Sequence, residues 1–301
     1  MATKQAKPFV KWAGGKTQLL HEIEKSLPDD LGIKDNVTYV EPFIGGGAVL
    51  FWILQKYPNI KRAVINDINE DLINTYRTIK QNPKDLIALL TYIQKDYISK
   101  SQEARKDYFL RQRDKFNSEN NDIITNSALF IFLNRTCFNG LYRVNSKGKF
   151  NVPHGKYTNP KICDTENILA CHNLLQKTDI LQGDFEQTLD YAGKNTLFYC
   201  DPPYKPLNQT SSFTAYTKED FDDNDQIRLS KFCNEISSKG STFILSNSDV
   251  NTKQQNNTFF DNLYSSYNIR RVSATRMINS NASHRGILNE LMISNKQIVF
   301  R

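Results

Sequence analysis

Residues 37–52, VTYVEPFIGGGAVLFW, decide the fold. The apolar and β-branched residues at 37–40 favour a strand, the three glycines at 45–47 favour a turn, and the apolar run from Ala48 favours a helix. A second strand signal, RAVIND, covers 62–67, and DINEDLINTYRTI then predicts a helix that begins with acidic residues. Two β-turn-α units in succession predict an α/β domain with a parallel, doubly wound sheet.

The alternation of strands and helices is interrupted from residue 76 to residue 165. Apolar residues recur at helical spacing over 83–97, 104–116 and 126–135, and FNGLYRVNSKGKFNVPHGKY at 138–157 then predicts a basic β-hairpin. Strand signals return at 177–182, 195–200 and 241–248, and the runs 268–277 and 289–295 predict an antiparallel pair at a mixed edge of the sheet. We therefore expect a catalytic domain of residues 1–75 and 166–301, interrupted by an inserted helical and hairpin subdomain of residues 76–165.

The charge is unevenly distributed along the chain. Lys plus Arg minus Asp plus Glu is 39 − 32 = +7 overall. Residues 76–165 carry 16 − 8 = +8 of it and the rest 23 − 24 = −1. A concentrated excess indicates a face that meets a polyanion, although a solvated basic face has the same composition.

The cysteines, the histidines and the apolar runs of the sequence bear on the cellular compartment and on metal binding. The five cysteines include no CxxC pair and the four histidines no HxxxH spacing, which favours reduced thiols over a structural zinc. We find neither a signal-peptide pattern nor an apolar run of membrane-spanning length, so a cytoplasmic protein is expected.

The most informative short motif is DPPY, at 201–204, which follows the apolar run LFYC. Open α/β sheets bind ligands outside the carboxyl ends of their strands. A ring-conjugated amino group is a weak nucleophile, and a site that methylates it must accept hydrogen bonds from both amino hydrogens. Asp201 offers a carboxylate, Pro202 a backbone carbonyl in a loop whose prolines remove competing N–H groups, and Tyr204 a flat face for stacking. A rigid turn with Asp201 as a cap is the alternative interpretation.

Glycine and acidic motifs predict a nucleotide-like ligand nearby. The glycines of FIGGGAV let the backbone approach a ligand at a helix N-terminus, but Leu50 stands where the dinucleotide pattern GxGxxG needs glycine. Asp67 follows Gly47 by 20 residues, a spacing that suits a ribose contact, although a helix cap is the plainer role. GDF at 183–185 adds a carboxylate and an aromatic ring that could hold a purine.

WAGGKT at 12–17 imitates the end of a phosphate-binding loop. The full pattern needs a glycine at position 10, where this chain has Val10, and no strong strand precedes it. A phosphate loop is therefore disfavoured.

In chain order, KWAGGK, EPFIGGGAV, INDIN, the basic hairpin, GDF and DPPY resemble the Dam-type (D12 class) family of DNA adenine-N6 methyltransferases. An insertion that precedes DPPY resembles the family's α group. The resemblance implies a Rossmann-like S-adenosylmethionine-dependent methyltransferase fold, with a mixed, mostly parallel sheet, that methylates an adenine flipped out of duplex DNA. The catalytic loop it implies is Asp201, Pro202, Pro203 and Tyr204. The S-adenosylmethionine contacts it implies are Trp12, Lys16, Phe43, Gly45, Gly47, Asp67, Asp184, Phe185 and Asp201.

The same resemblance assigns DNA contacts to the inserted segment. It implies that Lys11 approaches a target guanine, that Phe138 and Asn139 wedge into the base stack, and that Leu141 and Arg143 read bases. Arginine bidentate to guanine is the commonest specific major-groove contact, whereas a phosphate clamp would add affinity without sequence preference. The implied target is GATC, with a longer GAT-containing site as the alternative. We expect a monomer or weak dimer on duplex DNA, with no metal and no membrane partner.

Four other functions compete with this interpretation. A cytosine-N4 enzyme usually carries serine at the position of Asp201, and a cytosine-C5 enzyme needs a nucleophilic cysteine after proline, whereas Cys200 follows Tyr199. A nicotinamide-dependent oxidoreductase is disfavoured by Leu50 and the basic insertion. A non-catalytic DNA-binding regulator would bind DNA without incorporating methyl groups.

Overall fold

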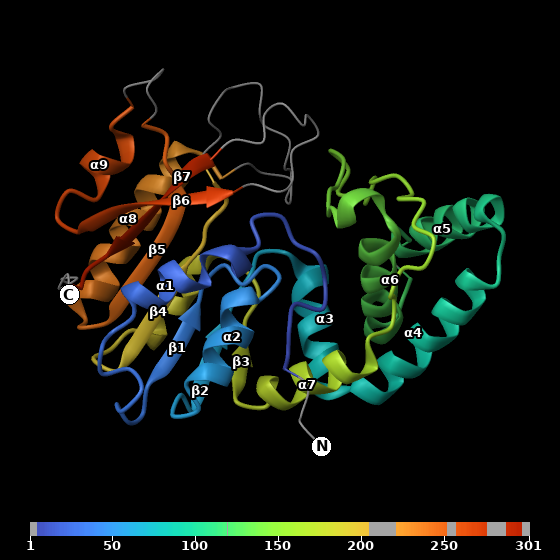
Figure 1. Cartoon of the computed structure of the whole chain (residues 1–301), viewed down its shortest axis with the longest axis horizontal. Coiled ribbons are helices and arrows are strands. Elements are labelled where there is room, and N and C mark those ends of the chain that lie inside the picture. The colour runs from blue at the N-terminus through green and yellow to red at the C-terminus, as the bar shows by residue number, and fades with distance from the viewer. Residues whose placement is uncertain (1–4, 119, 205–220, 252–256, 276–286, 297–301) are drawn as a thin grey trace.

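A single mixed sheet of seven strands organises the part of the chain that the structure, a computed structural model, describes (Figure 1). The described residues are 5–118, 120–204, 221–251, 257–275 and 287–296. The order across the sheet is β3-β2-β1-β4-β5-β7-β6. The strands are β1 (Thr38–Glu41), β2 (Arg62–Ile65), β3 (Thr178–Ile180), β4 (Thr196–Cys200), β5 (Thr242–Ser248), β6 (Asn268–Thr275) and β7 (Ile287–Ser294).

The first five strands run parallel, and β7 enters antiparallel between β5 and β6. In the register of the central strands, Val40 lies opposite Val64 on one side and Phe198 on the other. The chain builds outward from β1 through β2 to β3, and then restarts on the other side with β4. This is the doubly wound order with a switch point between β1 and β4, as the sequence predicts, and the mixed edge is confirmed.

Helices cover both faces of the sheet. Successive residues of β4 alternate between two apolar cores, with Leu197 and Tyr199 in one and Phe198 and Cys200 in the other. Burial on both faces explains why the parallel strands are almost continuously apolar. The elements that flank the sheet are η1 (Lys16–Leu19), α1 (Leu20–Ser26), α2 (Ala48–Lys56), α3 (Glu70–Gln81), α7 (Thr165–Leu175), η3 (Phe185–Tyr191), α8 (Asp223–Ser238) and α9 (Phe259–Leu263).

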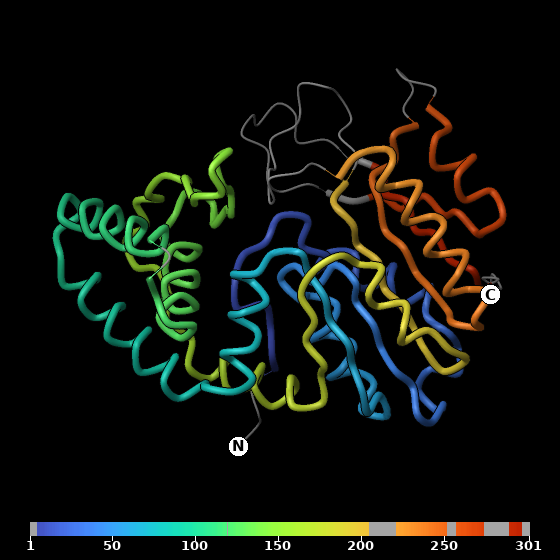
Figure 2. The backbone as a smooth tube through the Cα atoms, turned by 180° about the vertical axis from the view of Figure 1, so that it is seen from behind, coloured from blue at the N-terminus to red at the C-terminus, as the bar shows by residue number. Residues whose placement is uncertain are grey.

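The helices predicted between residues 83 and 136 are present and lie beside the sheet, next to α3 and α7 (Figures 1 and 2). They are α4 (Pro83–Ile98), α5 (Gln102–Phe116) and α6 (Ile123–Thr136). The residues at their N-termini explain where these helices begin. Pro83 occupies the first turn of α4, and the side chains of Ser101 and Asp122 cap α5 and α6. α6 is buried along most of its length and contacts α3, α4 and α5, so it forms the core of this part.

The β-hairpin expected at 138–157 is present as an antiparallel return of the chain, without a continuous ladder of hydrogen bonds. The segment doubles back through only two isolated antiparallel bridges, Cys137 with His154 and Val144 with Phe150, and begins with the short 3-10 turn η2 (Phe138–Gly140). Gly140 is left-handed, with φ of 65°, and Pro153 lacks an N–H donor. Both interrupt a continuous ladder, so the segment is an antiparallel loop packed on the helices.

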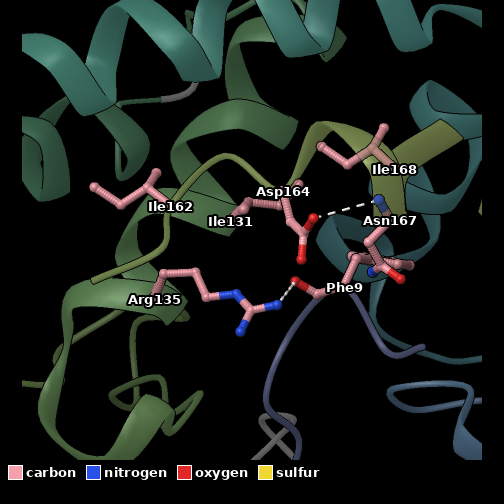
Figure 3. Close-up of a pocket in the computed structure, with 7 residues that line it drawn as sticks. All are labelled: Phe9, Ile131, Arg135, Ile162, Asp164, Asn167 and Ile168. Carbon is pink, nitrogen blue, oxygen red and sulfur yellow. Dashed lines mark hydrogen bonds between the residues drawn. The ribbon is translucent and has the colours of Figure 1, made fainter. Parts of the chain in front are cut away.

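The N-terminal segment joins the helical part to the sheet. The backbone of Lys11 exchanges two hydrogen bonds of 2.8 Å with the Asn134 side chain, and Arg135 Nη2 donates to the Phe9 carbonyl at 2.8 Å (Figure 3). A hollow of about 10 Å³ remains between Arg135, Asp164 and Asn167 (Figure 3). That volume holds about one water molecule, so this small pocket, which Phe9, Ile131, Ile162 and Ile168 also line, is a structural joint rather than a ligand site.

All five cysteines are free and buried. Within the described ranges, no cluster of three metal-ligating side chains is present. No helix of those ranges has the length and apolar character needed to cross a bilayer. The sequence predicts a polar loop at NTKQQNNTFF, residues 251–260, of which 252–256 lie outside the described residues.

Candidate active site

Three acidic residues follow or end neighbouring parallel strands. Glu41 is the last residue of β1, Asp67 follows β2 by two residues, and Asp201 directly follows β4. Because β1 lies between β2 and β4, the sheet brings the three to one edge. Burial raises the pKa of Glu41 well above its usual range, and the carboxyl accepts a hydrogen bond of 2.6 Å from Tyr39. Glu41 is thus a core group, whereas Asp67 and Asp201 remain partly accessible.

Lys16 and Asp201 form an ion pair at this edge. Lys16 Nζ lies 2.9 Å from Asp201 Oδ1 and also donates to the Gly14 carbonyl at 2.8 Å. The lysine is only 4% exposed, and the Asp201 side chain is 21% exposed. The lysine of the WAGGKT motif therefore points inward to a carboxylate, which a phosphate-binding loop would not do.

Only one oxygen of Asp201 is engaged by the described residues. Oδ1 receives both Lys16 and the Ser246 hydroxyl, the latter at 2.9 Å, and no described residue donates to Oδ2. Burial raises the pKa of Asp201, and the Lys16 ammonium opposes that rise. Asp201 is thus a partly buried carboxylate with one oxygen open to a ligand.

The two prolines after Asp201 differ in their partners. The Pro203 carbonyl accepts from Gln226 Nε2 at 3.2 Å, and Asn247 in turn donates to Gln226 Oε1 at 3.0 Å. Gln226 and Asn247 are both fully buried. No described residue donates to the Pro202 carbonyl. The loop is therefore anchored through Pro203 and presents a second acceptor at Pro202.

Tyr204 is held at two points. Lys16 Nζ lies 4.4 Å from the centre of its ring, and its hydroxyl donates to Glu290 Oε2 at 2.6 Å. Burial raises the pKa of Tyr204 well above its usual range, so the phenol stays protonated. DPPY is thus a loop whose acid and aromatic ring share one lysine.

The glycine loop lies at the ends of β1 and β2. Gly45 and Gly47 have φ of 48° and 73°, and Gly47 precedes the first turn of α2. Asp67 Oδ2 accepts from the Gly45 amide at 3.0 Å, and burial raises the pKa of Asp67. Asn69, and not Asp67, caps α3. The plain capping role for Asp67 is therefore wrong, and its carboxylate instead braces the glycine loop.

An aromatic group adjoins this loop. The rings of Phe43 and Phe185 lie 5.2 Å apart, and the guanidinium of Arg228 lies 5.0 Å from the centre of the Phe185 ring. Arg228 Nη2 donates to both oxygens of Asp184 at 3.0 Å, and this bonding raises the pKa of Arg228. The predicted purine-binding pair Asp184 and Phe185 is thus organised by an arginine on α8.

The residues predicted to contact DNA gather on the loop after α6. The side chain of Lys11 packs against this loop at Gly140: a Cβ placed on Gly140 would lie 2.4 Å from Lys11 Cδ. Phe138 is 50% exposed, an unusual state for a large apolar ring. Arg143 Nε donates to Asn151 at 2.8 Å. Asn139, at φ of 56°, and Leu141 complete the group.

One stack connects this loop to the glycine loop. Trp12 stacks on Tyr142 at a centroid distance of 5.5 Å and an interplanar angle of 24°. A Cβ on Gly45 would lie 2.9 Å from Trp12 Cδ1, so the indole also packs on the glycine loop. The Tyr142 hydroxyl donates to Asp71 at the start of α3, at 3.1 Å. Trp12 therefore lies at the junction of the two predicted sites.

Sequence reasoning missed the residues that hold the DPPY loop. These partners are Ser246, Gln226, Asn247 and Glu290. A usable signal exists for three of them. Ser246 and Asn247 are polar residues inside the strand β5, and a buried polar residue needs a partner. Glu290 has the same signal on β7, where it is buried beside Leu291 and Met292.

The fold and the site together define an α/β protein that binds its ligand at the carboxyl ends of its strands, with a glycine loop, a carboxylate that accepts from that loop, and an acid-proline loop. The comparisons with known proteins specify the family. The model of D12 class N6 adenine-specific DNA methyltransferases matches residues 12–278, and the chain belongs to that family. It is an adenine-specific DNA methyltransferase with a Rossmann-like methyltransferase fold, DNA is its substrate, and the family uses a methyl donor.

Similar proteins are named consistently with that family. The chain is 49% identical to the type II methyltransferase M.MjaIII of Methanocaldococcus jannaschii, covering 97% of this chain and 99% of the relative. It is 40% identical to the type II methyltransferase M1.LlaDCHI of Lactococcus lactis, covering 96% and 95%. It is 34% identical to the DNA adenine methylase of Haemophilus influenzae, covering 95% and 92%.

Proposed function

We propose that this enzyme flips an adenine out of duplex DNA, holds it at the DPPY loop, and methylates its N6 atom with S-adenosylmethionine as donor. One observation carries the proposal: Asp201 Oδ2 and the Pro202 carbonyl are two acceptors, on adjacent residues, without a donor among the described residues. An exocyclic amine has two hydrogens to place as its nitrogen becomes tetrahedral. The pair of acceptors matches that need.

The residues around the glycine loop suit S-adenosylmethionine. Asp67 can accept from ribose hydroxyls, because each of its oxygens retains a lone pair beyond its bond to the backbone. Phe43 is partly exposed and offers apolar ring surface for an adenine, the buried ring of Phe185 supports Phe43 from behind, and Asp184 offers an acceptor beside them. When bound, S-adenosylmethionine supplies an electrophilic methyl group on its sulfonium. Its further contacts in this proposal are Trp12, Lys16, Gly45, Gly47 and Asp201.

The chain's own groups prepare the amine. Lys16 offsets the cost of burying the Asp201 charge, and therefore keeps an ionised acceptor at a site where burial favours the neutral acid. Pro202 and Pro203 lack N–H groups that would compete for these acceptors. The Tyr204 ring offers stacking of about 1–3 kcal/mol against the cost of unstacking the base.

Recognition of DNA belongs, in this proposal, to the inserted segment of residues 76–165, with residues 1–75 and 166–301 as the catalytic domain. The segment carries the positive excess of the chain, 16 − 8 = +8. Arg143 and Leu141 read bases, Phe138 and Asn139 fill the space of the flipped base, and Lys11 approaches a guanine. We propose GATC as the target, with a longer GAT-containing site as the alternative. The proposed working form is a monomer or weak dimer on DNA in the cytoplasm.

The test is a map of the modified bases. Plasmid DNA that lacks methylation is incubated with the purified enzyme and S-adenosylmethionine, and N6-methyladenine and N4-methylcytosine are located by sequencing. We expect N6-methyladenine at GATC. A longer consensus around GAT would support the alternative target, and N4-methylcytosine alone would overturn the proposal.

The role of Arg143 has its own test. Arg143→Ala should lower the preference for GATC over sites with one base changed by about tenfold or more, as the loss of a bidentate base contact predicts. A uniform loss of affinity at all sites would instead identify Arg143 as a phosphate clamp.

A further inference from the structure

We propose that Glu290 is a positioning residue for methyl transfer, which acts by fixing the ring of Tyr204. The inference rests on the proposed role of the DPPY loop and names a further residue of that site. Glu290 lies on β7, 86 residues after Tyr204, and is 7% exposed. No sequence motif connects the two positions.

The hydrogen bond between Tyr204 and Glu290 is short. Glu290 Oε2 accepts from the Tyr204 hydroxyl at 2.6 Å, at the short end of the range for O–H···O hydrogen bonds. Glu290 is buried and Tyr204 is partly buried, so little water competes for the carboxyl group. The antiparallel register sets Glu290 opposite Ser248 of β5 and Val272 of β6, so a strand that is paired on both sides holds the carboxyl group.

Two contacts together determine where the Tyr204 ring lies. Lys16 approaches it at 4.4 Å from the ring centre, and the same ammonium is paired with Asp201. Glu290 holds the opposite, hydroxyl end. Without Glu290 the Tyr204 hydroxyl loses its acceptor among the described residues, and the ring can turn away from Lys16. Glu290 therefore fixes the ring on which the flipped adenine would stack, beside the acceptor carboxylate.

The experiment is a double-mutant cycle of Glu290→Ala and Tyr204→Phe, which remove the same hydrogen bond from its two ends. The readout is the single-turnover rate of methyl transfer to a duplex at saturating donor and DNA. We expect each variant to slow transfer by about tenfold, and the double variant to be no slower than the slower single one. Glu290→Gln, whose amide oxygen can still accept from the phenol, should recover most of the rate. Asn289→Ala, on the exposed side of the same strand, is the matched control and should leave the rate unchanged.

Binding measurements separate positioning from a merely structural role. The affinity of each variant for S-adenosylhomocysteine and for the duplex should stay within about threefold of wild type. If Glu290→Ala slows transfer as much in the Tyr204→Phe background as in wild type, or acts through lost donor binding, the inference is wrong. Tyr204→Phe alone keeps it testable should Glu290→Ala fail to fold, because a wild-type rate in that variant also overturns it. Methylation retained by an Asp201→Ala variant would refute the proposed role of the loop while leaving the cycle readable.

Discussion

Replacement of Lys16 by methionine should shift the pH dependence of methylation. The side chain keeps its approximate length and apolar stem but loses the ammonium that lies 2.9 Å from Asp201 Oδ1. Ser246 then remains as the described donor to that oxygen. Burial, which already raises the pKa of Asp201, is no longer opposed by a nearby cation.

The size and sign of the shift follow from the structure. A cation at this distance lowers the pKa of a carboxyl by about 1–3 units, and one unit corresponds to about 1.36 kcal/mol. Asp201 is 21% exposed, so water replaces part of the lost interaction, and we expect the rate of methylation at neutral pH to fall by about tenfold. Activity needs the ionised carboxylate, which is present above the pKa of Asp201 and is lost as pH falls through it. A higher pKa therefore moves the acid limb of the profile to higher pH.

The assay is single-turnover methylation between pH 5 and 9 at saturating donor and DNA. The Lys16→Met variant should be slow at neutral pH and recover as the pH rises. Lys25→Met is the matched control, because Lys25 pairs with Glu22 on the exposed surface of α1 and should leave the profile unchanged. An acid limb at the wild-type position, with only donor affinity reduced, would refute the reasoning and make Lys16 a donor contact alone.

Two other predictions concern stability. Gly47→Ala places a Cβ 2.4 Å from Tyr76 Oη at φ of 73°, so we expect a loss of about 2 kcal/mol or more in the free energy of unfolding. Gly193→Ala is the control, because a Cβ there meets nothing within 4 Å. Urea titrations measure both variants, and an equal loss of unfolding free energy in the two would contradict the prediction. Gln226→Leu leaves the Pro203 carbonyl and the Asn247 amide without their partner, which should cost about 1–3 kcal/mol and lower the thermal midpoint. An unchanged midpoint would show that water replaces the amide.

Much of the fold was predictable because its signals are local. The parallel strands are short apolar runs that end at glycine or acidic residues, and the helices between residues 83 and 136 repeat their apolar positions at helical spacing. The segment 138–157 was harder to predict. Alternation predicted a hairpin, but Gly140 and Pro153 break the ladder, and the loop packs on helices in place of a neighbouring strand.

For each contact in the site, the sequence predicted one of the two residues and not the other. DPPY, the glycine loop and Asp67 could be found because each stands at or near the end of a strand signal. The residues that hydrogen-bond to the DPPY loop could not be paired with it from the sequence. Ser246, Gln226 and Glu290 lie 23 to 86 residues away from their partners along the chain. Strand register and helix orientation bring these residues together, and neither is encoded in a local pattern. Lys16 shows the same limit, since nothing in its motif WAGGKT indicates that its side chain pairs with Asp201.

The central claim is that the open oxygen of Asp201 accepts a hydrogen of the target amine. The most direct measurement compares Asp201→Ala with wild type in two assays, single-turnover methyl transfer to a hemimethylated GATC duplex and equilibrium affinity for the same duplex. We predict that transfer becomes undetectable while the duplex affinity changes by less than about threefold. Transfer near the wild-type rate, or a duplex affinity lost in parallel with activity, would contradict the account.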